Sequence, residues 1–168
     1  MATQTISYSA NTAITMDLSS LASSAGFVAG RESTEVDNTT NKFVDAIVQG
    51  KVKVGTTPTA NTNINIYVWG ADTSLATTPI DVLDGLDSAE TLTNSGVLIS
   101  GLVLAASISV LATTSDITYN VKPFSVAALF GGVMPKFWGL YAAHNTVAAL
   151  NATNANLFSY NGIKYDIV

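Results

Sequence analysis

Few residues in this sequence have the side chains that acid–base or nucleophilic chemistry requires. The chain has no cysteine, and His144 is its only histidine. A Ser-His-Asp triad would have to use His144, but the chain lacks the Gly-x-Ser-x-Gly sequence that presents a serine on a strand-to-helix turn. A lone histidine beside Asn145 in an aromatic segment is more typical of a hydrogen-bonded structural residue than of a base or a metal ligand. These features favour a protein that is not an enzyme.

Four carboxylates, Asp81, Asp84, Asp87 and Glu90, recur at every third position. Glycoside hydrolysis needs an acid and a nucleophile at a fixed separation, which a loop does not provide. Calcium prefers such oxygen ligands, but an EF-hand loop places them at alternate positions. The run therefore predicts a solvated surface and no catalytic, cofactor or metal site. Two alternatives stay open: a calcium site in this run, and a pocket in which Asp84, Asp87 and His144 converge.

The composition favours contact with other protein. Hydrophobic residues make up 48% of the chain and charged residues only 11%, against ~25% in an average soluble protein. The seven basic residues form no patch, and none lies between Lys53 and Lys122, so direct nucleic-acid binding is not expected. A surface with little charge is poorly protected against association. We therefore expect a homo-oligomer, a dimer or a trimer.

Neither a secretory signal nor a membrane span is indicated. The first residues contain no basic segment followed by an apolar one. The most apolar stretch, Val97 to Ala112, is shorter than the ~18–20 residues that cross a bilayer and is interrupted by serines and a glycine. We expect no membrane contact and a protein made in a cytoplasm.

The clearest strand runs from Phe43 to Val54, where every second residue from Val44 onward is apolar except at Gly50, which predicts a bulge. Residues 64–70 have the same β-branched and aromatic character and are predicted to pair antiparallel with this strand. Residues 72–90, with their turn formers and acidic run, predict an exposed excursion from the sheet.

Further strands are predicted at 97–104, 107–112, 117–121, 136–144 and 158–168, with one helical turn at 125–130. No stretch shows sustained helical periodicity. Short strands separated by frequent turn signals are typical of a sandwich. The predicted fold is all-β and mostly antiparallel, a β-sandwich or jelly roll with an extended N-terminal arm and little helix.

The domain organisation predicted is a single β-sandwich or jelly-roll domain over 37–168, preceded by an arm over 1–36. Residues 3–8 and 13–18 within that arm form either a hairpin or two extended segments. Its many small polar residues and few aromatic anchors suit a segment that becomes ordered when laid across neighbouring subunits.

Five aromatic residues suggest a carbohydrate platform as an alternative, if they are exposed. Alternation along strands turns some of them inward, however, so a core or an interface explains them more simply. The five are Tyr67, Trp69, Phe137, Trp138 and Tyr141.

Several stretches resemble small virion structural proteins of tailed bacteriophages, in particular head decoration or cement proteins. They are Leu21-Ala-Ser-Ser-Ala-Gly-Phe-Val-Ala-Gly-Arg31-Glu-Ser33, Val36-Asp-Asn38, Lys42-Phe-Val-Asp45-Ala-Ile-Val-Gln-Gly-Lys51-Val-Lys-Val-Gly-Thr-Thr-Pro58, Asp81-Val-Leu-Asp-Gly-Leu-Asp-Ser-Ala-Glu90 and Ala128-Leu-Phe-Gly-Gly-Val-Met-Pro135-Lys-Phe-Trp138-Gly-Leu-Tyr-Ala-Ala-His144-Asn-Thr146.

The resemblance implies a protein on the capsid surface of a virion, made in the cytoplasm of a bacterial host. Its partners would be the major capsid protein and copies of itself. A cement protein gains stability from buried strand edges and apolar area rather than from catalysis. The alternatives are a tail or baseplate structural subunit and a carbohydrate-binding β-sandwich module.

Overall fold

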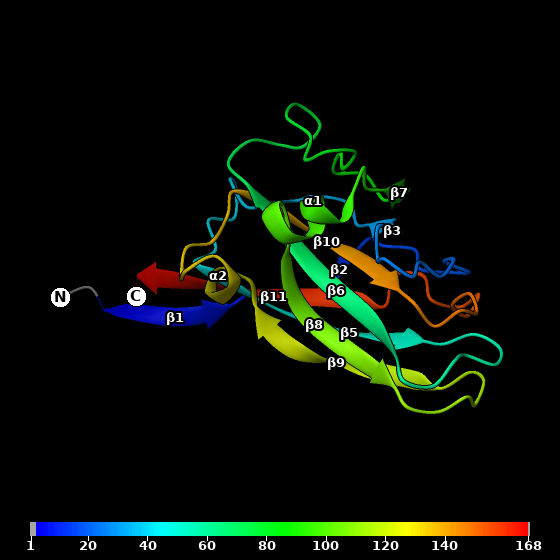
Figure 1. Ribbon diagram of the computed structural model, residues 1–168. Helices are drawn as coiled ribbons and strands as arrows, with labels where there is room; N and C mark the ends of the chain where they lie inside the picture. Colours follow the sequence, from blue (N-terminus) through cyan, green and yellow to red (C-terminus); the bar gives the residue numbers. More distant parts are fainter. Residues whose placement is uncertain (1–2, 168) are drawn as a thin grey trace.

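Two antiparallel sheets lie face to face in the computed structural model, which describes residues 3–167 (Figure 1). The predicted all-β, sandwich-like fold is confirmed. The first sheet has the order β1 (Gln4–Tyr8), β11 (Phe158–Ile167), β5 (Asp45–Lys53) and β9 (Thr118–Ser125), and β2 (Thr12–Ile14) also pairs with β11. The second has the order β7 (Ala89–Thr91), β3 (Ala29–Glu32), β10 (Phe137–His144), β6 (Thr62–Ala71) and β8 (Val103–Val110), and β4 (Val36–Asp37) also pairs with β10.

Alternating side chains of the first sheet build the core between the sheets. Of the alternating apolar residues predicted from Val44 to Val54, those from Ala46 onward are buried and Val44 is exposed; Phe158 and Tyr160 on β11 are buried too. The register between β5 and β9 shifts between Val48 and Gly50, which confirms the predicted bulge. A Cβ atom on Gly50 would lie 2.4 Å from the Phe158 ring, so the strand needs glycine there.

A second core lies on the other face of the second sheet. Trp69 and Tyr141 are completely buried there against Leu75, Leu83 and other side chains of residues 72–102, which we call the cover segment. Figure 1 shows this segment, with α1 (Ser95–Ser100) and β7, lying over β6 and β10. The predicted exposed excursion over 72–90 does leave the sheet and most of its residues are exposed or half-buried, but its buried Leu75 and Leu83 complete a core that the prediction did not include.

The predicted pairing of residues 43–54 with 64–70 is wrong, since β5 and β6 belong to different sheets. Six consecutive residues of β6, from Ile64 to Trp69, are buried, so this strand must be covered on both faces. It therefore occupies the interior of the second sheet, between β10 and β8. The connection after β5 crosses from one sheet to the other.

The predicted strand over 97–104 is also wrong at its start, because residues 95–100 form α1. The Asn94 side chain accepts a hydrogen bond from the Gly96 backbone nitrogen at 2.8 Å and so caps the helix. Only Val103 onward is extended, and β8 continues without a break to Val110. No helix among residues 3–167 has the length and apolar character needed to cross a membrane.

Other predicted elements are confirmed. The helical turn within 125–130 is α2 (Val126–Leu129), whose Ser125 hydroxyl accepts from the Ala128 nitrogen at 3.0 Å. Strands β9, β10 and β11 lie where 117–121, 136–144 and 158–168 predicted them, with Val168 outside the described residues.

The N-terminal segment is divided between both sheets. β1 and β2 each pair with β11 rather than with one another, so the extended alternative is observed and not the hairpin. Beyond β2, Ile14, Met16 and Leu18 are buried in the core, and β3 and β4 join the second sheet. From Ile14 onward this segment is part of the sandwich.

Truncation of Leu83 to alanine tests whether the cover segment is part of the folded core. Because Leu83 is completely buried, Leu83→Ala is expected to lower the free energy of unfolding by about 2–5 kcal/mol in urea denaturation. Leu86→Ala is the matched control, since Leu86 is 60% exposed and its loss is expected to change stability by about 0.5 kcal/mol or less. Equal effects of the two substitutions would contradict the second core.

Candidate functional site

The structure places His144 as a buried structural residue. Its Nε2 lies 2.9 Å from the Leu21 carbonyl oxygen and its Nδ1 lies 2.8 Å from the Thr146 hydroxyl. Because a carbonyl only accepts, Nε2 carries a proton, while the Thr146 hydroxyl beside Nδ1 has a single proton that it donates to the Ala148 carbonyl at 2.9 Å. Burial lowers the pKa of His144 below its ordinary value. With both nitrogens occupied, the ring joins β10 to the loop at Leu21 and offers no free base.

The four carboxylates of the acidic run have separate partners. Asp81 accepts from Thr93 and Asp84 from the Leu86 nitrogen, while Ser88 donates to Glu90. Asp87 accepts from Arg31 Nε at 2.6 Å, in a pair largely shielded from solvent. Among residues 3–167 no three His, Asp or Glu side chains are grouped as a metal site would require.

Glu32 on β3 is a buried carboxylate that no pattern in the sequence indicated. Its oxygens accept hydrogen bonds from the backbone nitrogens of Asp84 and Gly85 at 3.0 and 3.1 Å. Glu35 similarly accepts from the Leu75 nitrogen at 2.8 Å. Burial raises the pKa of Glu32 to about 8, although the two backbone donors favour the charged form. These bonds hold the cover segment against β3.

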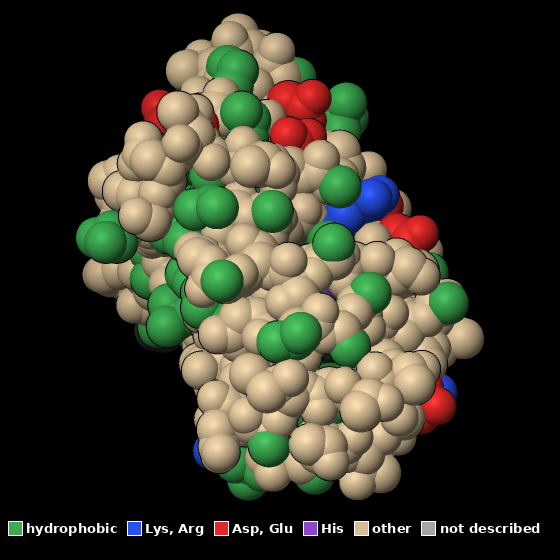
Figure 2. All heavy atoms as spheres, turned by 45° about the vertical axis from the view of Figure 1, so that its right-hand side comes forward, with side chains coloured by type: hydrophobic (Ala, Val, Ile, Leu, Met, Phe, Trp, Pro, Cys, Tyr) green, Lys and Arg blue, Asp and Glu red, His purple; other side chains and the backbone are tan. Residues whose placement is uncertain are grey.

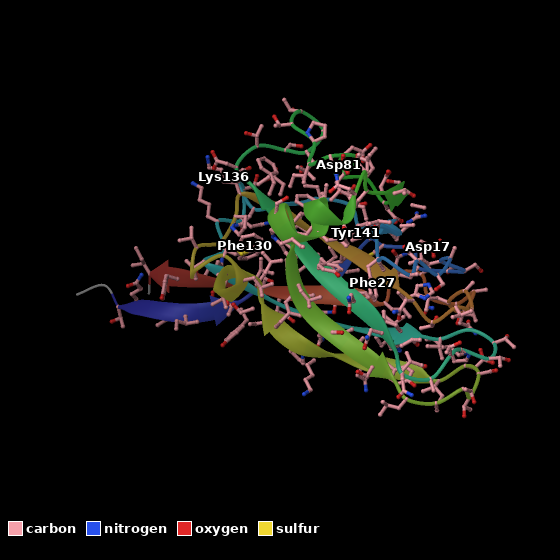
Figure 3. The ribbon with its side chains drawn as sticks, viewed as in Figure 1. Asp17, Phe27, Asp81, Phe130, Lys136 and Tyr141 are labelled. Carbon is pink, nitrogen blue, oxygen red and sulfur yellow. The ribbon has the colours of Figure 1, made fainter. Side chains whose placement is uncertain are left out.

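The aromatic platform expected for a carbohydrate-binding module is absent. Trp69, Trp138 and Tyr141 are all completely buried, and Tyr67 is nearly so. The Tyr141 hydroxyl donates to the Val28 carbonyl at 2.6 Å, beneath the cover segment (Figure 3). The prediction of core positions is confirmed for these side chains, and the carbohydrate alternative loses the residues on which it depended.

Four of the twelve exposed large hydrophobic side chains of residues 3–167 lie together on a two-stranded ribbon formed by β1 and the last residues of β11. This terminal ribbon consists of β1 and residues 163–167 of β11, paired antiparallel with Ile6 opposite Tyr165 and Tyr8 opposite Ile163. Ile6 is 60% exposed, Tyr8 68%, Tyr165 53% and Ile167 80%. Opposite residues in an antiparallel pair point to the same side, so these four side chains share one face.

The other face of the terminal ribbon is polar. Ser7 donates to Asp166 at 2.5 Å, and Lys164 Nζ lies 3.3 Å from the other oxygen of that carboxylate. The hydroxyl of Ser7, and then Lys164, lower the pKa of Asp166. Thr5, opposite Asp166 in the register, lies on this face too. The ribbon is thus amphipathic.

The apolar face of the ribbon points away from the core. Side chains at every second position of a strand point to the same face of the sheet. Phe158 and Tyr160 on β11 are buried in the core, so Lys164, four residues after Tyr160, points to the core-facing side as well. Tyr165 and Ile167 therefore project from the outer face of the sheet. At Gly162 the apolar residues of β11 change from one face of the strand to the other. A Cβ atom on Gly162 would lie 2.4 Å from the Phe43 ring. This reversal is a signal in the sequence that could have predicted the ribbon.

The terminal ribbon also ends in an unprotected strand edge. No strand among the described residues pairs with the outer edge of β1, and its five residues include no charge and no proline. Two of the other edges carry the usual protection, because β9 contains Lys122 and Pro123 and β7 is only three residues long, whereas the edge strand β8 is uncharged like β1. An uncharged edge beside an exposed apolar face is a ready site for another protein.

The rest of the visible surface is also poor in charge. Figure 2 shows a face on which the backbone and side chains that are neither hydrophobic nor charged predominate, with hydrophobic side chains between them and few charged groups. Comparison of the chain with models of protein families, with curated protein sequences and with solved structures finds no match. The function is therefore inferred from the residues themselves.

Substitution of Glu32 by glutamine is expected to alter the pH dependence of stability. Between about pH 4.5 and 8 the unfolded chain loses the Glu32 proton while the folded chain keeps it, so the free energy of unfolding falls as pH rises through this range. Glu32→Gln removes that decrease, on the order of a few kcal/mol at most. Thermal denaturation from pH 4 to 9 measures the difference.

Asp72→Asn is the control for this experiment, because it removes one negative charge from an exposed carboxylate. The Asp72→Asn protein should retain the wild-type slope above pH 5. A Glu32→Gln protein with the same slope as the wild type would show that Glu32 is ionised in the folded chain.

Proposed function

We propose that this chain is a non-enzymatic structural protein of a bacteriophage virion, a decoration or cement protein that binds the shell of the major capsid protein. The observation that carries the proposal is the terminal ribbon, whose apolar side chains project outward with nothing of residues 3–167 covering them. A two-stranded ribbon in water is marginally stable by itself. Contact with a partner protein supplies the missing layer.

The chemistry of the ribbon suits a protein partner. Tyrosine side chains are enriched at protein interfaces because each combines a large apolar ring with a hydrogen-bonding hydroxyl. Tyr8 and Tyr165 provide two such anchors beside Ile6 and Ile167. The only charges on the ribbon, Lys164 and Asp166, are paired with each other on its opposite face. Such a surface offers nothing to a phosphate backbone.

The cover segment and the buried aromatic residues support a structural role. The side chains that could have formed a binding or catalytic site lie within packed cores. They are Trp69, Trp138 and His144. The chain therefore presents edges and apolar area rather than a reactive pocket. These are the means by which a cement protein stabilises a shell.

Loss of shell binding after charge is introduced on the ribbon tests the proposal. Purified protein is mixed with empty shells of the major capsid protein from the same genome and sedimented. The wild-type protein should co-sediment, and Tyr165→Lys/Ile167→Lys should bind at least about tenfold more weakly because buried lysines would lose their hydration. Leu111→Lys is the matched control, since Leu111 is 73% exposed and lies outside the ribbon.

The result expected for Leu111→Lys is wild-type binding. Wild-type protein that remains in the supernatant, or that sediments with purified tails and not with shells, would overturn the assignment to the head. Equal binding by the double variant and the control would show that the terminal ribbon is not the contact surface.

A further inference from the structure

We infer that two copies of this chain join through their β1 edges, in an antiparallel pair centred on Ile6, so that their first sheets become one continuous sheet. β1 is the outermost strand of its sheet, and its outer backbone groups are unpaired within the described residues. Unpaired edge groups favour addition of a further strand.

β1 is suited to pairing with itself. In an antiparallel pair about a two-fold axis at Ile6, Ile6 meets Ile6 of the second copy, Gln4 meets Tyr8, and Thr5 meets Ser7. The apolar face of β1 carries Gln4, Ile6 and Tyr8, and its polar face carries Thr5 and Ser7. The apolar face of one copy therefore continues into the apolar face of the other, and the polar face into the polar face. A self-complementary edge is what an isologous interface requires.

Charge does not oppose this pairing. The chain carries a formal charge of −5, but β1 has no charged residue. On the adjacent part of β11, Lys164 and Asp166 lie 3.3 Å from one another, so the described ribbon has no net charge. The other long uncharged edge, β8, faces a groove that it shares with β9, where Lys122 and Pro123 also line the space. β1 is therefore the more open edge.

The position of the ribbon leaves room for a second copy. β5 begins opposite Ile163, so among the strands of residues 3–167 only β1 pairs with residues 164–167 of β11. Figure 1 shows β1 and the end of β11 projecting at one extremity of the molecule, together with both chain ends and away from β7 and α1. Two sandwiches can approach edge to edge there without contact between their cover segments.

The pairing would double the apolar face. Ile6, Tyr8, Tyr165 and Ile167 of both copies would form one surface on the outer side of the joined sheet. We expect this doubled surface to contact the shell, and that expectation rests on the proposed function. The dimer itself does not depend on the shell and is measured on the free protein.

Oxidative cross-linking of Ile6→Cys tests the pairing directly, because the natural chain has no cysteine. Two-fold pairing at Ile6 brings the paired Cα atoms to about 4.5–5.5 Å, within the range that a disulfide bridges. The variant is expected to form a covalent dimer at least about tenfold faster than Leu111→Cys, since the paired thiols share a high effective concentration. Equal rates for the two variants would overturn the proposal.

A charge exchange at the same position provides the second test. Ile6→Lys and Ile6→Glu are each expected to weaken the dimer at least about tenfold in analytical ultracentrifugation, because like charges meet at the axis. An equimolar mixture of the two should restore a dimer containing one of each. Circular dichroism checks that each variant is folded. A monomeric wild type, or a mixture that stays monomeric, would overturn the inference.

The same measurements separate this inference from the proposed function. Tyr165→Lys/Ile167→Lys changes β11 and leaves the β1 edge intact, so it should retain the dimer while losing shell binding. A wild-type dimer that does not bind shells would overturn the proposed function alone. A monomer that binds shells would overturn the dimer alone.

Discussion

Strand β6 must be covered on both faces, and the rest of the fold depends on this constraint. Ile66 and Val68 face the first sheet, whereas Tyr67 and Trp69 face the opposite side, and all four are buried. A single sandwich would leave the second set in water. Residues 72–102, the cover segment, fold back over the second sheet, bury Tyr67 and Trp69 and add a third layer.

The third layer is attached by polar groups as well as by leucines. Glu32 and Glu35 accept backbone hydrogen bonds from the cover segment, and Arg31 pairs with Asp87. Buried polar groups are stable only when such bonds are made. With the outer face of the second sheet occupied in this way, the first sheet is left with an outer face open to partners. The reversal of hydrophobic alternation at Gly162 turns one end of that face apolar.

Local patterns in the sequence predicted local structure well. The alternation from Val44 to Val54 and the helical turn at 125–130 each depend on neighbouring residues, and β5 and α2 lie where these patterns predicted them. Which strands pair was not predictable in the same way, because β5 and β6 are adjacent in sequence but belong to different sheets.

The third layer was hidden for a similar reason. Leu75 and Leu83 lie among acidic and turn-forming residues, and their place in a core is explained only by Trp69, which they help to cover on the other side of the sheet. Glu32 gave no sign of burial, since its backbone partners are distant in the chain. The terminal ribbon, by contrast, could have been predicted from the sequence. The apolar residues Phe158 and Tyr160 occupy even positions, whereas Tyr165 and Ile167 occupy odd positions and therefore point to the other face.

Hydrogen–deuterium exchange on the protein with and without capsid shells tests most directly whether the terminal ribbon is the surface that binds them. Whether or not the β1 edges of two copies are paired, a ribbon whose apolar face is uncovered opens readily, and a partner that covers this face slows amide exchange further. The predicted result is protection on shell binding confined mainly to residues 4–8 and 163–167. Protection elsewhere, with unchanged exchange in both of these segments, would contradict the account.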